Sequence, residues 1–254
     1  MDIKGHVSII TGSAAGLGAS IAQQLAAKGC NVVINYSRSE ADAKATQAAC
    51  EAEGVETLLV QADIGDDAQC RRLADETMAK WGRIDSLINN AGMTKYVAHD
   101  DLEGLTSEDF ANIFRLNVTG VYQMIRAVAP HMKAGGLGSV VNISSAAGES
   151  GGGSCVAYAA SKGALNIMTK SLARSLAPEI RVNAVCPGFI GTRWQVAGSG
   201  SDEVYNKRVK SLEESTPLRR ANTPDDIAES VVWFVEGARW VTGETLLVDS
   251  GSHL

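Results

Sequence analysis

The stretch that decides the fold is Thr11-Gly12-Ser13-Ala14-Ala15-Gly16-Leu17-Gly18, which follows an apolar run and leads directly into a helical pattern. Glycines at these places let the backbone turn tightly and approach a ligand without a Cβ in the way. The first amide groups of a helix have no partner within the helix, so they can bind an anion. A glycine-rich turn also occurs without any ligand, but the strand, loop and helix together favour a pyrophosphate site with the spacing G-x-x-x-G-x-G.

Short apolar runs alternate with longer helical patterns on both sides of this loop. Strands are predicted at 7–11, 31–36, 57–61, 85–89, 139–143, 181–185 and 246–248, and helices at 18–28, 116–132 and 155–176. Two more helices are expected, one after Ser39, whose side chain can cap it, and one ending at Trp81. Because the strands are continuous apolar runs, they suit a parallel sheet that is buried on both faces. The expected fold is α/β: a single-domain, Rossmann-type doubly wound parallel sheet of about seven strands over 1–254, with helices on both faces.

The composition narrows the class of protein. Of the 254 residues, 45% are apolar and 20% are charged, which argues against disorder. The net charge of -6 and the absence of a Lys/Arg block disfavour nucleic-acid binding. No apolar run is long enough for a membrane span, and the first ten residues lack a cleavable export signal, so a cytoplasmic protein is expected. The 5 cysteines include no C-x-x-C pair and the 4 histidines show no ligand spacing, so free thiols and no metal are expected.

Further motifs follow the glycine loop in a fixed order along the chain. Asp63-Ile64 ends the third strand, Asn89-Asn90-Ala91-Gly92 follows the fourth, and Asn117 lies in the next long helix. After the fifth and sixth strands come Ser145, the Y-x-x-x-K motif Tyr158-Ala159-Ala160-Ser161-Lys162, Pro187-Gly188 and Thr192. Together with the loop, this ordered set resembles the short-chain dehydrogenase/reductase family over nearly the whole chain.

The pair Tyr158 and Lys162 carries the chemistry that the resemblance implies. The two residues are four apart on a predicted helix, so they share one face. A phenol has a pKa of about 10, and a nearby ammonium favours the phenolate and lowers that pKa toward the range useful for proton transfer. The family pattern favours Ser145 over the adjacent Ser144 for holding the substrate oxygen, and it assigns Asn117 to a water in a proton relay through Lys162. The predicted catalytic residues are therefore Asn117, Ser145, Tyr158 and Lys162.

The end of the second strand favours NADP(H) over NAD(H) as the cofactor. An NAD site usually has an acidic residue there, whereas this chain reads Tyr36-Ser37-Arg38. Arg38 offers a planar fork, and Ser37 a hydroxyl, for a 2′-phosphate.

Two observations count against the preference for NADP(H). Glu40 and Asp42 are acidic, but they are expected in the first turn of the following helix. Ala15 stands where NADP-dependent relatives often carry a basic residue. The predicted cofactor residues are Gly12, Ser13, Ala15, Gly16, Leu17, Gly18, Tyr36, Ser37, Arg38, Asp63, Ile64, Asn90, Ala91, Gly92, Tyr158, Lys162, Pro187, Gly188, Ile190 and Thr192.

The substrate end has fewer recognisable signals. The predicted substrate contacts are Ser145, Tyr158, Met93, Glu149 and Trp194, with Cys155 and Phe189 as further candidates. The segment 189–215 holds several glycines and mixed charges, so it is expected to be a long substrate loop with weak helix.

The resemblance implies an NADP(H)-dependent oxidoreductase that interconverts a small-molecule carbonyl and an alcohol by hydride transfer. The layout is similar to the 3-oxoacyl-carrier-protein reductase branch, but Gly136 and Glu179 stand where that branch uses basic residues, so smaller ketones, aldehydes and sugars stay open as substrates. A non-catalytic NADPH-sensing protein is the alternative from another class, and the complete Ser145, Tyr158 and Lys162 set disfavours it. The family also implies a homotetramer, joined through the helices at 116–132 and 155–176.

Overall fold

All seven strands of the sheet are parallel in the computed structural model, which describes residues 2–254. They are β1 (Val7–Ile10), β2 (Asn31–Tyr36), β3 (Thr57–Gln61), β4 (Ser86–Asn89), β5 (Gly138–Ile143), β6 (Ile180–Pro187) and β7 (Thr245–Val248). Their order is β3-β2-β1-β4-β5-β6-β7, so the direction of winding reverses between β1 and β4. The carboxyl ends of the strands at such a reversal are where doubly wound sheets bind their ligands. The predicted Rossmann-type doubly wound fold is confirmed.

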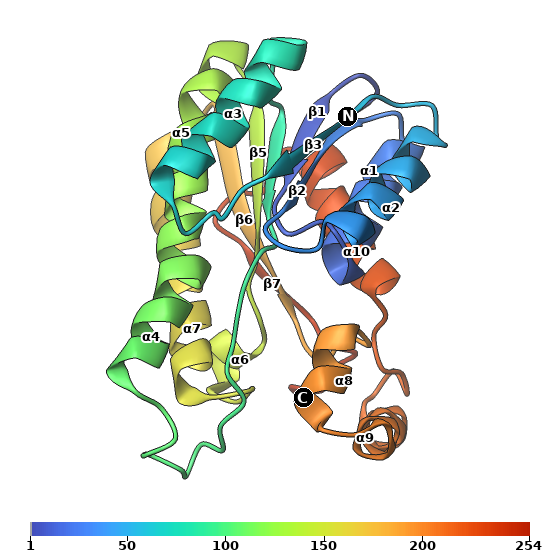
Figure 1. Cartoon of the computed structure of the whole chain (residues 1–254), viewed down its shortest axis with the longest axis vertical. Helices are drawn as coiled ribbons and strands as arrows, with labels where there is room; N and C mark the ends of the chain where they lie inside the picture. The colour runs from blue at the N-terminus through green and yellow to red at the C-terminus, as the bar shows by residue number, and fades with distance from the viewer. Residues whose placement is uncertain (1) are drawn as a thin grey trace.

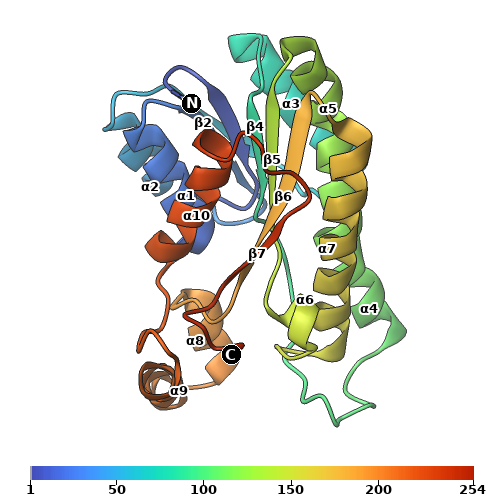
Figure 2. The same ribbon diagram turned by 180° about the vertical axis from the view of Figure 1, so that it is seen from behind.

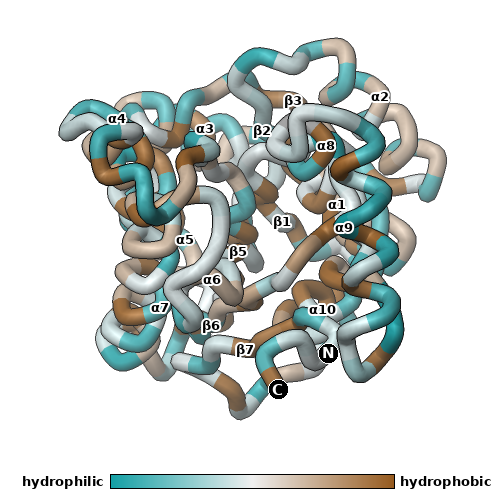
Figure 3. The backbone as a smooth tube through the Cα atoms, turned by 90° about the horizontal axis from the view of Figure 1, so that it is seen from below, coloured by the Kyte–Doolittle hydropathy of each residue, from teal (hydrophilic) through white to brown (hydrophobic). Residues whose placement is uncertain are grey.

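Helices cover both faces of the sheet, as Figures 1 and 2 show from opposite sides. One face carries α1 (Gly16–Ala27), α2 (Glu40–Glu51) and α10 (Pro224–Glu236), and the other carries α3 (Asp67–Trp81), α5 (Val121–Gly135) and α7 (Val156–Leu176). The helices α4 (Ser107–Phe114), α6 (Ala147–Ser150), α8 (Arg193–Ser199) and α9 (Asp202–Ser215) lie toward the carboxyl ends of the strands. Figure 3 looks onto those ends, with α8 and α9 on one side and α6 and α7 on the other.

The sheet is buried on both faces because successive strand residues pack into two different hydrophobic clusters. Ile10 and Ile34 belong to the cluster under α1 and α10, whereas their neighbours Ile9 and Val33 belong to the cluster under α3 and α5. All four side chains are fully buried. This two-sided burial is why the strands are continuous apolar runs instead of alternating patterns.

Two helices begin or continue differently from their sequence patterns. Helix α2 begins at Glu40 as expected, but Ser39 makes no side-chain capping bond, so the capping prediction for Ser39 is wrong. The predicted helix at 116–132 starts within a π-helical turn, η1 (Arg115–Gly120), that joins α4 to α5. A Cβ on Gly120 would lie 2.8 Å from the Ile64 carbonyl oxygen, so only a glycine lets this turn approach the end of β3.

The segment 189–215, which was expected to be a long loop with weak helix, is largely helical, so that part of the expectation is wrong. Ser201 caps α9 by accepting a bond from the Val204 amide, and α9 has no buried residue. Its half-buried residues Tyr205, Val209 and Leu212 follow helical spacing, but none of them is fully buried, so the apolar signal in this segment is weak. The two ends of the segment meet at a bridge between Ile190 and Asn222, where the Gly191 amide donates to the Asn222 carbonyl at 2.9 Å. The segment therefore leaves the sheet and returns to it at one place.

Candidate active site

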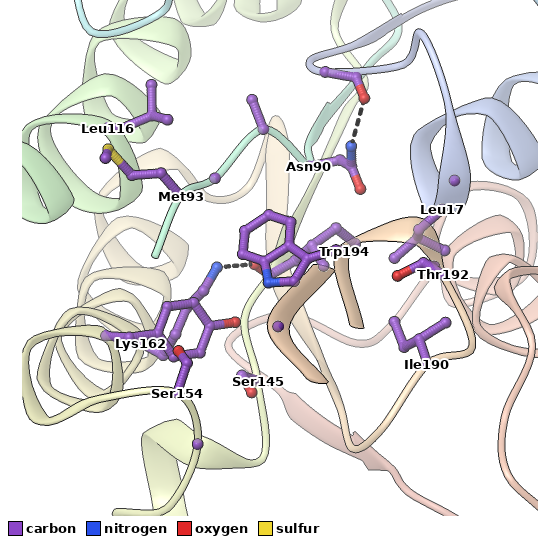
Figure 4. A pocket seen from close by; sticks show the side chains of 18 of the residues that line it. Leu17, Asn90, Met93, Leu116, Ser145, Ser154, Lys162, Ile190, Thr192 and Trp194 are labelled. Atoms are coloured by element: carbon purple, nitrogen blue, oxygen red, sulfur yellow. Dashed lines mark hydrogen bonds between the residues drawn. The ribbon is translucent and has the colours of Figure 1, made fainter. Parts of the chain in front are cut away.

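The glycine loop is fixed against the end of β4 by the motif that follows that strand. Gly12 has φ +63°, and a Cβ there would lie 2.9 Å from the Ala91 Cα. The Asn90 side chain donates to the carbonyls of Thr11 and Gly12 at 2.9 and 3.0 Å, and Figure 4 shows Asn90 in this position. A Cβ on Gly18 would lie 2.6 Å from the same amide nitrogen. The glycines thus allow a close approach of two backbones and leave the start of α1 open, which fits a dinucleotide pyrophosphate.

Asn35 near the end of β2 also fixes this loop, although no motif in the sequence indicated this role. Its Oδ1 accepts from the Gly12 amide at 3.1 Å, and its Nδ2 donates to the carbonyls of Val60 and Ala62 at 3.3 and 3.0 Å. The Asn35 backbone pairs in both directions with Ser13. This buried amide therefore ties β1, β2 and β3 together below the loop. Because its partners are far away in the sequence, only the folded chain reveals the role.

A single cavity of about 1480 Å³ runs along the carboxyl ends of the strands and contains most of the predicted site. The predicted residues that line it are Gly12, Ala15, Gly16, Leu17, Gly18, Ser37, Arg38, Asp63, Ile64, Asn90, Ala91, Gly92, Met93, Ser145, Tyr158, Lys162, Pro187, Gly188, Ile190, Thr192 and Trp194. Gly188 packs closely on Asp249, since a Cβ there would lie 2.7 Å from the Asp249 Cβ.

Some predicted residues do not line the cavity. The Ser13 hydroxyl is buried and donates to the Ile10 carbonyl at 2.8 Å. Tyr36 packs against the hydrophobic cluster under α1, and Glu149 is exposed on α6 away from the cavity. Cys155 is buried as the cap of α7, where its sulfur accepts from the Tyr158 amide. These side chains serve the framework or face solvent instead of the cavity.

The end of the cavity near β2 carries an arginine without an acidic partner. Arg38 lines the cavity, and its guanidinium makes no hydrogen bond or ion pair within residues 2–254. The acids nearby are engaged elsewhere, because Glu40 pairs with Lys44 at 2.8 Å and Asp42 pairs with Arg193 at 3.4 Å. Asp63 pairs with Arg115 of η1 and accepts from the Gly65 amide. A free guanidinium at this place fits an anionic group on the ribose.

Ser145, Tyr158 and Lys162 meet near the middle of the cavity. Ser145 lies beyond β5, whereas the other two residues come from the first turns of α7, and Figure 4 shows Ser145 and Lys162 on one side of the Trp194 ring. The Lys162 Nζ donates to the Ile143 carbonyl at 2.7 Å and lies 5.6 Å from the centre of the Tyr158 ring. A Cβ on Gly153 would lie 3.5 Å from the Tyr158 Cδ1.

Burial dominates the protonation of both groups. It raises the pKa of Tyr158 to about 12, and a hydrogen bond with Ser145 opposes this shift. It lowers the pKa of Lys162 to about 8. The expectation that Lys162 brings the Tyr158 pKa down is therefore not met in this structure. The physical reason is that the ammonium is bound to the Ile143 carbonyl and that the phenol has lost its solvation.

The two adjacent serines have different partners. The Ser144 hydroxyl is buried and donates to the Asn166 Oδ1 at 2.5 Å and to the Lys162 carbonyl at 3.2 Å. The Ser145 hydroxyl accepts from the Ala147 amide at 3.2 Å and is the one that bonds to Tyr158. This arrangement favours Ser145 as the residue that holds a substrate oxygen.

Asn117 lies in η1 behind the cavity wall, not in its lining. Its Oδ1 accepts from the Met93 amide at 2.9 Å, and its Nδ2 donates to the Met93 carbonyl and the Ser161 hydroxyl at 3.0 Å. The side chain is thus used in holding the Met93 loop against α7. Both Nδ2 protons are therefore used, so Asn117 could contact a relay water only through an oxygen atom.

The substrate end is lined by residues that the sequence motifs did not identify. They include Tyr96, Val97, His99, Ser154, Gln195 and Arg208. The Tyr96 hydroxyl donates to the Trp194 carbonyl at 3.2 Å, and Gly198 packs directly on the Tyr96 ring. These contacts join the loop after β4 to α8, and no short-range pattern in the sequence indicates such a pairing.

The parallel sheet, the glycine loop and the Ser-Tyr-Lys cluster define an oxidoreductase with a Rossmann-type dinucleotide site. A family model described as enoyl-(acyl carrier protein) reductase matches residues 12–253. The chain belongs to the short-chain dehydrogenase/reductase family, as the resemblance in sequence indicated.

Three relatives illustrate this membership. A Streptomyces violaceoruber protein named as a ketoacyl reductase of the granaticin polyketide synthase is 42% identical over 98% of this chain and 96% of its own. A Staphylococcus epidermidis protein named as a 3-oxoacyl-[acyl-carrier-protein] reductase is 32% identical over 97% and 98%. A structure from Burkholderia xenovorans described as a short-chain dehydrogenase/reductase has a TM-score of 0.91 and 38% identity, with 98% of both chains covered.

None of the helices within residues 2–254 is both long and apolar enough to cross a membrane. The same part of the chain holds no cluster of three or more His, Cys, Asp or Glu side chains suited to a metal ion. All five cysteines are buried and free.

Proposed function

We propose that the protein is an NADP(H)-dependent oxidoreductase that interconverts a small-molecule carbonyl and a primary or secondary alcohol. The observation that carries this proposal is the convergence of Ser145, Tyr158 and Lys162 on the cavity that also contains the glycine loop. A binding protein without turnover has no chemical need for this set of side chains.

The proposed mechanism divides the reaction between hydride and proton. A nicotinamide cofactor supplies or accepts the hydride when it is bound. Ser145 donates a hydrogen bond to the substrate oxygen and stabilises the charge that develops on it. Tyr158 gives its proton to that oxygen during reduction and takes one from the alcohol during oxidation. Lys162 holds positive charge beside the phenol. Asn117 would hold a water in the proton relay that continues from Tyr158 through Lys162.

The preference for NADP(H) rests on the β2 end of the cavity. Arg38 has a free guanidinium there, and Ser37 contributes a hydroxyl. An acid that would hold the ribose hydroxyls of NAD is absent from the end of β2, since Glu40 and Asp42 are paired with Lys44 and Arg193. The amides of Gly16 and its neighbours would hold the pyrophosphate, and Asp63 and Ile64 would flank the adenine.

A second candidate function is the reduction of 3-oxoacyl thioesters on a carrier protein. The names of the Streptomyces and Staphylococcus relatives favour it. The absence of basic residues at Gly136 and Glu179 argues against it, because a carrier protein is acidic.

The test is a spectrophotometric assay of NADPH and NADH oxidation at about 340 nm with ketones, aldehydes, sugars and acetoacetyl thioesters. We expect turnover with NADPH and at least one carbonyl compound. Turnover only with thioesters loaded on a carrier protein would favour the second candidate. Tight NADPH binding without turnover of any substrate would show a sensing protein instead of an enzyme.

We further propose a cytoplasmic homotetramer built through α5 and α7. Three apolar side chains on these helices are well exposed in the single chain, namely Tyr122 at 44%, Val156 at 40% and Ile167 at 66%. An interface would cover them.

A further inference from the structure

The cavity contains two guanidinium groups without an acidic partner, one at each end. The charged residues that line it are Arg38, Asp63, Arg115, Lys162, Arg193 and Arg208. Arg115 pairs with Asp63, Arg193 pairs with Asp42, and Lys162 donates to a backbone carbonyl. Arg38 is at the cofactor end. Arg208 is left at the substrate end, where no acidic residue lines the cavity and where its guanidinium makes no hydrogen bond or ion pair within residues 2–254.

The structure holds Arg208 in place through an aromatic stack. Its guanidinium carbon lies 5.2 Å from the centre of the Phe189 ring, and Phe189 directly follows Gly188 at the end of β6. The Tyr205 ring, three residues before Arg208 on α9, lies 5.9 Å from Phe189. Residues three apart lie on one face of a helix, so the side chains of Tyr205 and Arg208 both contact Phe189 from α9. Stacking covers one face of the guanidinium and leaves its N–H edge free for an oxyanion.

Tyr96 lines the same cavity as Arg208 and Tyr158, and its hydroxyl donates to the Trp194 carbonyl at 3.2 Å. Burial raises the pKa of Tyr96, while the hydrogen bond to Trp194 and the charge of Arg208 oppose that shift. Tyr96 in turn adds to the rise that burial causes in the pKa of Tyr158. In Figure 4 the Trp194 ring lies next to Lys162, with Ser145 below it. A substrate that reaches from Ser145 past Tyr96 would therefore present its far end to Arg208.

From these contacts we infer that Arg208 binds an anionic group of the substrate, so that the protein acts on carbonyl compounds bearing a carboxylate or a phosphate away from the reacting carbon. This inference rests on the proposed function and names its substrate class. The shared chemistry is an oxyanion that meets a planar guanidinium fork. The chain carries a net charge of -6, so most of its surface does not attract an anion. The unpaired Arg208 guanidinium at the substrate end would attract the anionic group of the substrate.

The experiment compares matched pairs of charged and neutral substrates. One arm uses ω-1 oxo acids of increasing length and their methyl esters, which tests a carboxylate. The other arm uses acetoacetyl pantetheine and acetoacetyl 4′-phosphopantetheine, which tests a phosphate. The variants are Arg208→Gln and Arg208→Lys. Lys207→Gln is the control, because it removes the same charge from the adjacent exposed position of α9, which does not line the cavity.

We expect the wild-type protein to prefer the charged member in one arm at a particular length. Arg208→Gln should raise KM for that member about tenfold, the effect of one exposed charge-assisted hydrogen bond, with kcat and the neutral member nearly unchanged. Arg208→Lys should restore part of the loss, and Lys207→Gln should behave as wild type. Added NaCl should weaken the preference for the charged member, because salt screens an exposed pair.

Equal KM values within every pair, or an equal effect of Arg208→Gln on both members, would overturn the inference while leaving the proposed function intact. Reduction of other carbonyl compounds, but of neither member of any pair, would overturn the inference alone. If the wild-type protein reduces no carbonyl compound at all, the proposed function fails. The Arg208 site is then judged by calorimetric binding of glutarate and inorganic phosphate. If glutarate and phosphate bind the wild-type protein and Arg208→Gln equally well, the inferred anion site at Arg208 is overturned.

Discussion

Tyr158 and Lys162 occupy one face of α7, yet the lysine ammonium bonds to the Ile143 carbonyl and not to the phenol. Both groups are buried, so each is held in its neutral form more strongly than in water. For the proposed reduction this is favourable, because an acid must carry its proton when the substrate arrives. For alcohol oxidation, the raised pKa of Tyr158 predicts a slow reaction at neutral pH, because the phenol must first lose its proton. This reaction should speed up as the pH rises.

Replacing the phenol tests its role directly. Tyr158→Phe should lower kcat by at least about 10²-fold, because a general acid is lost, and should leave the Kd for NADPH within about twofold. Tyr122→Phe, at an exposed position on α5, is the matched control and should keep full activity. Steady-state rates and fluorescence titration with NADPH measure the two effects. Near-normal turnover of Tyr158→Phe would remove Tyr158 from the mechanism.

The pH profile follows from the Lys162 pKa of about 8. The ammonium is present below that pH and is lost as pH rises through it, whereas Tyr158 stays protonated over the same range. The kcat/KM for carbonyl reduction should therefore be level below about pH 8 and fall above it. In Lys162→Arg any remaining activity should lack this limb, since guanidinium does not titrate there. A limb at the same pH in both proteins would assign it to another group.

At this scale the sequence predicted the residues that belong to motifs and missed those that act through distant partners. Asn90, Ser145, Tyr158 and Lys162 fall within recognisable spacings and line the cavity. Asn35 and Arg208 stand in no motif, because their roles depend on contacts between β2 and the loop or between α9 and Phe189.

At the scale of elements, the loop before α1 depends on the strands beneath it. Asn35→Ala would remove the side chain that bonds to the Gly12 amide and to the carbonyls of Val60 and Ala62. It should lower the free energy of unfolding by about 2 kcal/mol and weaken NADPH binding about tenfold. Urea unfolding and fluorescence titration check these values.

Asn31→Ala provides the control from the other end of β2. Asn31 accepts from the Glu56 amide at an exposed place far from the loop, so its loss should cost less stability and leave the NADPH Kd unchanged. A similar loss of affinity in both variants would mean that Asn35 does not position the loop.

The sequence predicted the bounds of elements whose residues are buried in the core, and it missed elements that bury few residues or depend on contacts with distant residues. The strands β2 and β3 have the predicted bounds, because their residues pack into both clusters. Helix α9 has a helical apolar period at Tyr205, Val209 and Leu212, but it buries no residue fully, and the glycines and charges around it masked that pattern. The π-helical turn η1 depends on how the chain packs against Ile64, which a local pattern does not contain.

At the scale of the whole molecule, cofactor binding should appear as thermal stabilisation. At about 100 times its Kd, NADPH should add about 2.7 kcal/mol and raise the Tm by about 5–10 °C, and NADH at the same concentration should add less. Arg38→Asp should remove this difference, whereas Arg174→Asp, at an exposed position at the far end of α7, should keep it. Scanning fluorimetry gives the values, and an unchanged preference in Arg38→Asp would contradict the role of Arg38.

The proposed assembly predicts a solution mass four times that of the 26.6 kDa chain. Light scattering coupled to size exclusion measures it directly. Ile167→Glu, which puts a charge on an exposed apolar position of α7, should shift the mass downward, because an interface would have to bury that charge. A monomeric wild-type protein would rule out the tetramer.

The bridge between Ile190 and Asn222 joins the two ends of the segment between them at one place beside the sheet. Its two ends are already side by side, and α9 within it contributes nothing to the hydrophobic clusters. An exchange of this segment for that of a relative would therefore leave the strand order, the glycine loop and the Ser-Tyr-Lys cluster as they are. Libraries confined to residues 193–221, which leave Thr192 unchanged for the cofactor, should therefore alter the substrate range with little loss of folded protein.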